Sequence, residues 1–203
     1  YGIYYEFLPM EDLHAENPKT LRLDQVQLNK NYALIISTNA GLWRYMIGDT
    51  IKFTSLSPHR IQITGRTKHF INAFGEELII DNAEKGLAKA CQETHAVIRD
   101  YTACPIYFEG DEVGGHEWII EFEQKPDNIE GFTDLLDQTL REVNSDYDAK
   151  RFKDMALRRP LLHLAPDGTF YNWMKNRGKL GGQHKVPRLA NDRAYVDEIL
   201  KML

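Results

Sequence analysis

The stretch TGRTKHFINAFGEELII, residues 64–80, separates two parts of the sequence that have different hydrophobic patterns. It contains Gly65, the cations Arg66 and Lys68, and a second glycine that is followed by two glutamates. A polar segment with glycines can absorb a large backbone rotation, as a hinge between two bodies must, although a passive linker can have the same composition. We therefore predict a domain boundary at residues 65–68 and a solvated hairpin turn at the two glutamates.

The part before this boundary, residues 1–64, is predicted to form β structure. Short apolar runs or period-two alternation, bounded by turn signals, mark four candidate strands at residues 1–9, 32–38, 43–56 and 60–66. Several short strands with turns between them indicate a small β-barrel or antiparallel β subdomain. The three tryptophans of the chain, Trp43, Trp118 and Trp173, are expected to pack in cores rather than to serve as ligand platforms.

The part after the boundary, residues 69–203, has a mixed pattern. The sequence predicts a hairpin, a helix, two strands, a helix, a strand and two helices, at residues 69–80, 81–91, 97–108, 117–123, 128–147, 158–165, 169–177 and 192–203. This order is typical of a ferredoxin-like domain built around an antiparallel sheet. The fold class that we expect is α+β.

Composition excludes several classes of protein. Of the 203 residues, 42% are hydrophobic and 27% are charged, which is ordinary for a globular protein. No apolar stretch approaches the ~18 residues of a membrane span. With 30 acidic against 25 basic residues, the chain is not suited to non-specific binding of nucleic acid. Neither the two cysteines nor the seven histidines have metal-ligand spacing, so we predict no metal site and reduced thiols in a cytoplasmic protein.

Two further stretches carry residues suited to binding a nucleotide. In WRYMIGDT, residues 43–50, a carboxylate at Asp49 can accept hydrogen bonds from two adjacent hydroxyls, as on a ribose, although Gly-Asp is also a common hairpin turn. RGKLGGQHKVPRL, residues 177–189, holds four cations and no acidic residue. Glycine-rich backbone beside lysine suits a phosphate, although Leu180 after Gly-Lys departs from the P-loop pattern and a solvated surface turn has a similar composition.

Taken together, these stretches resemble the C-terminal part of the auxin-responsive acyl-acid amido synthetases, the Gretchen Hagen family, within the adenylate-forming superfamily of acyl-CoA synthetases and luciferase. The resemblance extends over essentially the whole chain. It is carried by YYEFLP, LWRYMIGDTI, LREVNSDYDAKR and, most specifically, DGTFYNWMKNRGKLGGQHKVPRL. His184 stands where the family has tyrosine, and the Gly65-Arg66 pair is closer to the wider superfamily. We interpret these departures as signs of a bacterial-type member whose acyl substrate need not be a plant hormone.

The resemblance implies a role for four residues. Asp49 would hold the ribose hydroxyls of ATP, and Arg66 would help to bind the nucleotide. Lys68 would be the hinge about which the C-terminal domain swings between two half-reactions. Lys185 would bridge the attacking carboxylate and the α-phosphate, a role that suits a compact ammonium because negative charge builds up on the phosphorus. Lys179 has no counterpart in the family pattern and is the secondary candidate.

The resemblance also implies an activity. Residues 1–64 would be the β-rich end of a large N-terminal adenylation domain, and residues 69–203 a mobile C-terminal domain. The chain opens at Tyr1 without a leader, so we expect a piece of a longer protein that is inactive alone. The whole enzyme would use ATP with Mg²⁺ to convert a carboxylic acid into acyl-AMP. It would then transfer the acyl group to an amine, expected to be an amino acid, or alternatively to a thiol such as coenzyme A.

A hypothesis of a different class is a non-catalytic, ferredoxin-like module that binds an effector or RNA. The RNA version requires aromatic residues in a Lys/Arg-Gly-Phe/Tyr-Gly/Ala-Phe pattern, which the sequence lacks. An effector module would not explain why Asp49, the hinge-like segment and Lys185 occur in this order. We therefore expect small-molecule partners and the missing N-terminal domain, with no nucleic acid and no membrane.

Overall fold

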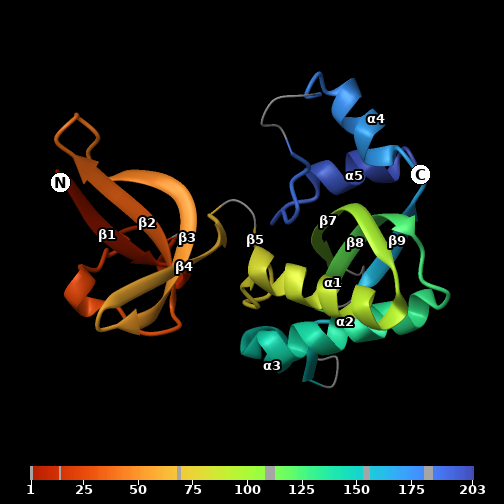
Figure 1. Ribbon diagram of the computed structural model, residues 1–203, viewed down its shortest axis with the longest axis horizontal. Coiled ribbons are helices and arrows are strands. Elements are labelled where there is room, and N and C mark those ends of the chain that lie inside the picture. The colour runs from red at the N-terminus through yellow and green to blue at the C-terminus, as the bar shows by residue number, and fades with distance from the viewer. Residues whose placement is uncertain (1, 14, 68–69, 108–112, 153–155, 181–184) are drawn as a thin grey trace. The chain divides into compact units, whose positions relative to one another are not determined.

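The computed structural model describes residues 2–13, 15–67, 70–107, 113–152, 156–180 and 185–203 (Figure 1). The chain divides into two compact units, Tyr1–Lys68 and His69–Leu203. We call them the first unit and the second unit, and describe each by itself.

The first unit is built around an antiparallel sheet in the order β1-β2-β3-β4. Its elements are β1 (Ile3–Pro9), the 3-10 helices η1 (Met10–Asp12) and η2 (Leu23–Gln25), β2 (Asn31–Thr38), β3 (Tyr45–Leu56) and β4 (His59–Arg66). One face of the sheet carries Phe7, Tyr32 and Phe53, whose rings meet edge to face with centroids 5.1 to 6.3 Å apart. The antiparallel β character expected of this part is therefore confirmed.

The second unit has a three-stranded sheet in the order β7-β8-β9 and a separate two-stranded sheet, β5-β6. Its elements are β5 (Phe70–Ile71), β6 (Leu78–Ile79), α1 (Ile80–Thr94), β7 (Val97–Tyr107), β8 (Gly114–Gln124), α2 (Ile129–Val143), α3 (Ser145–Arg151), β9 (Leu161–Ala165), α4 (Thr169–Asn176) and α5 (Ala194–Leu200). The α+β fold class is confirmed.

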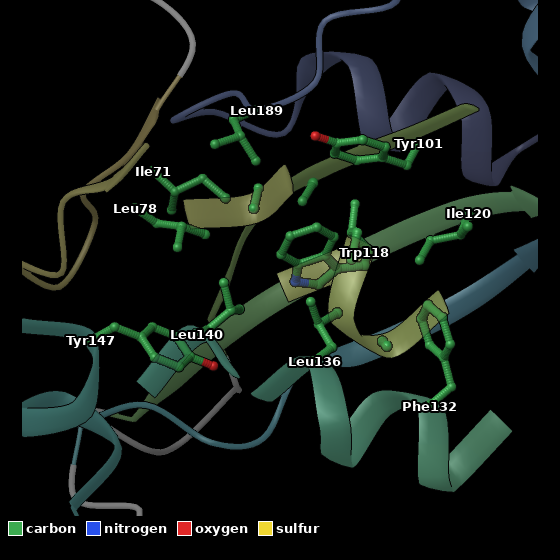
Figure 2. Close-up of a cluster of buried hydrophobic side chains, with 14 of the residues drawn as sticks. Ile71, Leu78, Tyr101, Trp118, Ile120, Phe132, Leu136, Leu140, Tyr147 and Leu189 are labelled. Atoms are coloured by element: carbon green, nitrogen blue, oxygen red, sulfur yellow. The ribbon is translucent and has the colours of Figure 1, made fainter. Parts of the chain in front are cut away.

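Both faces of the three-stranded sheet are covered, because side chains of β8 alternate between two apolar clusters. Trp118 and Ile120 belong to the cluster that includes α1 and α2, whereas Ile119 between them belongs to the cluster that includes α4 and α5. Figure 2 shows Trp118 at the centre of the first cluster, with Leu136 and Leu140 of α2 beside it. Such a strand, buried on both faces, forms the centre of the unit.

Three expectations need correction. The sheet is not antiparallel throughout, because β9 pairs with β8 in parallel. A parallel pair needs a long crossover connection, which α2 and α3 supply. The predicted helix at 128–147 is two helices, divided at Asn144. Trp118 and Trp173 are buried, but Trp43 is 82% exposed and lies in no core.

Candidate active site

Asp49 on β3 and Arg66 on β4 are cross-strand partners in the first unit. Their side chains form an ion pair, with 3.5 Å between Oδ1 of Asp49 and Nε of Arg66, and both are partly exposed. An exposed ion pair contributes little to folding stability. The pair instead presents an acceptor for hydroxyl groups next to a guanidinium that can hold an anion. The two residues predicted to bind a nucleotide thus lie side by side.

The backbone around Asp49 is shaped by the glycine before it. Gly48 has a φ of 92°, in the region that favours glycine. Its carbonyl oxygen accepts a hydrogen bond of 2.8 Å from the N–H of Thr67. A Cβ at position 48 would stand 3.5 Å from a guanidinium nitrogen of Arg66. Gly48 and Asp49 therefore lie inside β3, and not in the hairpin turn that the sequence also allowed.

A buried polar group supports this part of the sheet. The hydroxyl oxygen of Thr64 lies 2.5 Å from Oδ1 of Asn31 and 3.0 Å from the hydroxyl oxygen of Thr50. Thr50 directly follows Asp49 in the chain, so these bonds fix the backbone that carries the carboxylate. Lys68, the predicted hinge, lies outside the described residues.

Lys179 and Lys185 line one groove of about 620 Å³ on the second unit. Both side chains are exposed, and no carboxylate in the described part of the chain lies within ion-pair distance of either ammonium. The groove joins this basic stretch to β7, β8 and α4, through Arg99, Asp100, Glu121, Gly168, Phe170, Tyr171, Met174, Leu180, Val186 and Arg188. The structure therefore brings the primary and the secondary lysine candidates to the same place.

The carboxylates of this groove are already satisfied by the protein. Glu121 accepts hydrogen bonds of 2.9 and 3.0 Å from the N–H groups of Gly168 and Phe170, at the start of α4. Asp100 pairs with Arg188, at 2.6 Å. Burial raises the pKa of Asp100, and the charge of Arg188 partly opposes that rise. Glu121 and Asp100 therefore do not engage the ammonium groups of Lys179 and Lys185, which can bind an anionic ligand.

The backbone on both sides of residues 181–184 is held in place. Before them, the N–H of Lys179 donates to the carbonyl of Met174 at the end of α4, over 2.9 Å. After them, residues 187–190 run along the free edge of β7, where Ala103 donates to the carbonyl of Arg188 and accepts from the N–H of Ala190, at 2.9 and 3.0 Å. Lys185 therefore stands close to a firmly paired segment.

The sequence matches two domains of one family. Residues 1–66 match the GH3 family central domain, and residues 81–194 match the GH3 family C-terminal domain. The chain belongs to the GH3 family. The family's own division names residues 1–66 a central domain, so the assignment of residues 1–64 to the end of an adenylation domain stays a prediction.

GH3 relatives extend well beyond this chain. It is 26% identical over 201 residues to the indole-3-acetic acid-amido synthetase GH3.3 of Arabidopsis thaliana, covering 93% of this chain and 33% of that protein. It is 27% identical over 199 residues to the jasmonoyl-L-amino acid synthetase JAR4 of Nicotiana attenuata, covering 91% and 33%. The solved structure of the GH3.15 acyl acid amido synthetase shares its fold, with a TM-score of 0.70 at 19% identity over 98% of this chain and 36% of that one. The chain thus spans about a third of these proteins.

The sequence did not predict one buried polar pair of this GH3 chain. Glu76, expected on a solvated turn, is fully buried, and its Oε1 lies 2.8 Å from Nε2 of the equally buried His116 on β8. Its Oε2 accepts a 2.7 Å hydrogen bond from the N–H of Phe74. Nothing in the sequence signals a partner 40 residues away. The only local hint is the second glycine, Gly75, which has a φ of 83°.

Neither a metal site nor a membrane span emerges from the described residues. They contain no group of three or more His, Cys, Asp or Glu side chains that could hold a metal ion. No helix among them has the length and apolar character needed to cross a membrane.

Proposed function

We propose that the full-length protein is an ATP-dependent ligase that activates a carboxylic acid as acyl-AMP and transfers the acyl group to an amine. The observation that carries this proposal is Lys185, whose ammonium has no counter-ion among the described residues and which stands on a segment anchored beside a groove. Family membership and the paired Asp49 and Arg66 support it. Relatives named as amido and amino acid synthetases favour an amino acid as the amine.

In the first half-reaction, a carboxylate oxygen of the acid attacks the α-phosphorus of ATP, and pyrophosphate leaves with the electron pair of the broken P–O bond. Lys185 offsets the negative charge that builds up between these two anions. Asp49 accepts hydrogen bonds from the ribose hydroxyls, and Arg66 adds a positive charge beside the nucleotide. Each residue acts by position and charge alone, and none forms a covalent bond.

In the second half-reaction, the amine nitrogen attacks the acyl carbonyl carbon, the bond to AMP breaks, and the nitrogen gives up a proton. Lys68 is proposed as the hinge between the two half-reactions. Mg²⁺ would arrive with ATP, and the described residues provide no ligand cluster for it, so no step is assigned to the ion. We place the reaction in the cytoplasm, where the free thiols of Cys91 and Cys104 stay reduced.

The proposal is tested by ATP–pyrophosphate exchange with the full-length protein and a panel of carboxylic acids. Lys185→Ala is expected to lower exchange by roughly a hundredfold or more, because a preorganised charge is removed from the transition state. Lys179→Ala, the matched control in the same groove, is expected to have a much smaller effect. Undiminished exchange in Lys185→Ala would refute the assignment of the lysine.

Two more measurements complete the test. Amide formation from a panel of amino acids, compared with thioester formation from coenzyme A, decides the acceptor. The 203-residue chain alone should show no exchange, and measurable exchange would contradict our view that the whole protein is required.

A further inference from the structure

Arg188 lies three residues after Lys185 in the same basic stretch, and the proposed mechanism gives it no role. Its Nη1 lies 2.6 Å from Oδ1 of Asp100, which precedes Tyr101 on β7. The guanidinium carbon of Arg188 stands 4.5 Å from the centroid of the Tyr101 ring. An ion pair together with a stacked aromatic face holds a guanidinium in one orientation.

The platform beneath Arg188 belongs to the core of the second unit. The Tyr101 ring is buried and stacks on Trp118, with 6.0 Å between the ring centroids. Both residues are labelled in Figure 2. Its hydroxyl group donates to Oε1 of Glu84 on α1, over 2.8 Å. Asp100 is fixed as well, because its Oδ1 accepts the N–H of Tyr101 at 2.9 Å. Arg188 therefore rests on groups that cannot easily move.

The backbone between Arg188 and Lys185 is also held in place. The carbonyl of Pro187 accepts a 2.7 Å hydrogen bond from the hydroxyl group of Thr102, and Val186 is buried. Only Val186 and Pro187 separate Lys185 from Arg188, so the Cα atoms of Lys185 and Arg188 are at most about 11 Å apart. Proline fixes one of the backbone angles between them.

We propose that Arg188 is a positioning residue for Lys185: its pair with Asp100, stacked on Tyr101, sets where the ammonium group stands for the adenylation step. The inference rests on the proposed function. Lys185 has no role in the proposed acyl transfer, so Arg188 is expected to have none in that step either.

A contribution to folding stability does not explain the ion pair between Arg188 and Asp100. The Arg188 side chain is 35% exposed, and ion pairs with this exposure contribute little to folding. A replacement at position 188 should therefore leave the protein folded. Arg159 is a matched control, since it is 37% exposed and pairs with Glu130 and Asp134 of α2, away from the basic stretch.

The test uses the full-length protein and measures the two half-reactions separately. One assay is ATP–pyrophosphate exchange, and the other is amide formation from a synthetic acyl-adenylate. Arg188→Gln should lower kcat for exchange between about tenfold and a hundredfold, the effect of a misplaced catalytic group, with KM for ATP unchanged. Transfer from the acyl-adenylate should stay within about twofold, and Arg159→Gln should leave both assays within the same limit.

Asp100→Asn distinguishes positioning from direct contact with the nucleotide. If Arg188 positions Lys185, Asp100→Asn lowers exchange as Arg188→Gln does, and the double variant is no worse than either single one. A raised KM for ATP in Arg188→Gln, with Asp100→Asn harmless, would overturn the proposal and make Arg188 a ligand of ATP. Equal losses in both assays would overturn it in favour of a purely structural role, and unchanged exchange would overturn it outright. A harmless Lys185→Ala would show instead that the proposed function itself is wrong about the lysine.

Discussion

The carboxyl group of Glu76 is buried in the second unit, with its Oε1 2.8 Å from Nε2 of His116. Burial by itself raises the pKa of such a carboxyl group, because the charged form loses its water. The hydrogen bond and charge of His116, together with the N–H of Phe74, outweigh that effect and hold the pKa of Glu76 below its usual value. A pKa difference between folded and unfolded states makes folding stability depend on pH.

At pH 7, Glu76→Gln should lower the free energy of unfolding by about 1.5–3 kcal/mol, because hydrogen bonds to a buried carboxylate are replaced by weaker ones to a neutral amide. The folded-state pKa of Glu76 lies below the unfolded value near 4.5. The pair therefore stabilises the protein above that value, and the contribution is lost as the pH falls through the folded-state pKa. Urea unfolding over a series of pH values should accordingly show a shallower loss of stability in acid for the variant than for the parent protein.

Glu93→Gln is the control for this prediction. Glu93 pairs with the ammonium of Lys89, and both of these side chains are about half exposed to solvent. Solvent screening makes such a pair weak, so its removal should leave the acid limb almost unchanged. Identical acid limbs for the parent protein and Glu76→Gln would contradict the prediction.

Asp49→Asn tests the proposed ribose contact. An amide oxygen cannot form charge-assisted hydrogen bonds, which contribute about 1.5–3 kcal/mol each. KM for ATP in pyrophosphate exchange should therefore rise by at least about tenfold, with a smaller change in kcat. Asp81→Asn, which removes a surface ion pair with Lys85, serves as the control. An unchanged KM would remove Asp49 from the nucleotide site.

At this scale, Asp49, Arg66 and Lys185 stand in short stretches of sequence, and their roles stay predictions. The structure adds that Asp49 and Arg66 form a pair and that Lys185 lines a groove. The burial of Glu76 depends on β8, which folding brings to the turn from far along the chain. Trp43 shows the reverse case, since a ring that is usually buried lies exposed.

Among the elements, Asn144 divides what periodicity predicts as one helix into α2 and α3. Its Oδ1 accepts the N–H groups of Asp146 and Tyr147 at the start of α3, at 3.0 and 2.9 Å. Its Nδ2 donates to the carbonyl groups of Glu76 and Glu77, at 2.8 and 3.3 Å. One side chain thus caps a helix and holds the turn of the β5–β6 hairpin.

Three substitutions separate these two roles of Asn144. Asn144→Asp keeps a capping oxygen but loses the donor to the turn, whereas Asn144→Ala loses both. We expect the alanine variant to lose more stability than the aspartate variant, and more than the roughly 1 kcal/mol typical of a lost cap. Asn128→Ala is the control, because Asn128 caps only the N–H of Gly131 at the start of α2. An undiminished stability of Asn144→Asp in urea unfolding, with Asn144→Ala losing no more than Asn128→Ala, would show that the bonds to the turn contribute nothing.

The break at Asn144 could not be predicted, because apolar residues continue at helical spacing across it. Tyr147 on α3 is as buried as the residues of α2, and its hydroxyl donates to Asp137 of α2 over 2.6 Å. Hydrophobic periodicity reports which residues are buried, and does not report that the backbone leaves the helical conformation at Asn144. The parallel pairing of β9 is similar, since the sequence of a five-residue strand does not reveal which neighbour it joins.

For the whole molecule, the change in hydrophobic pattern predicts a boundary at residues 65–68. In the structure, the first compact unit ends at Lys68 and the second begins at His69. The three buried apolar clusters are each built from residues of one unit. The hydrophobic pattern of the sequence changes between the two units because each unit must bury its own apolar face. The chain spans about a third of the length of the relatives that it matches, so the proposed function concerns more than these two units.

Separate cores predict separate unfolding of the two units. Two of the three tryptophans, Trp118 and Trp173, are buried in the second unit, whereas Trp43 of the first unit is exposed. Tryptophan fluorescence should therefore report the unfolding of the second unit alone. Leu136→Ala, in the core of Figure 2, should destabilise the fluorescence transition by about 2–5 kcal/mol. Phe53→Ala, in the first core, should leave that transition in place and change only the circular dichroism signal. If both variants shifted both signals equally, the units would unfold as one cooperative body, and the two cores would not be thermodynamically independent.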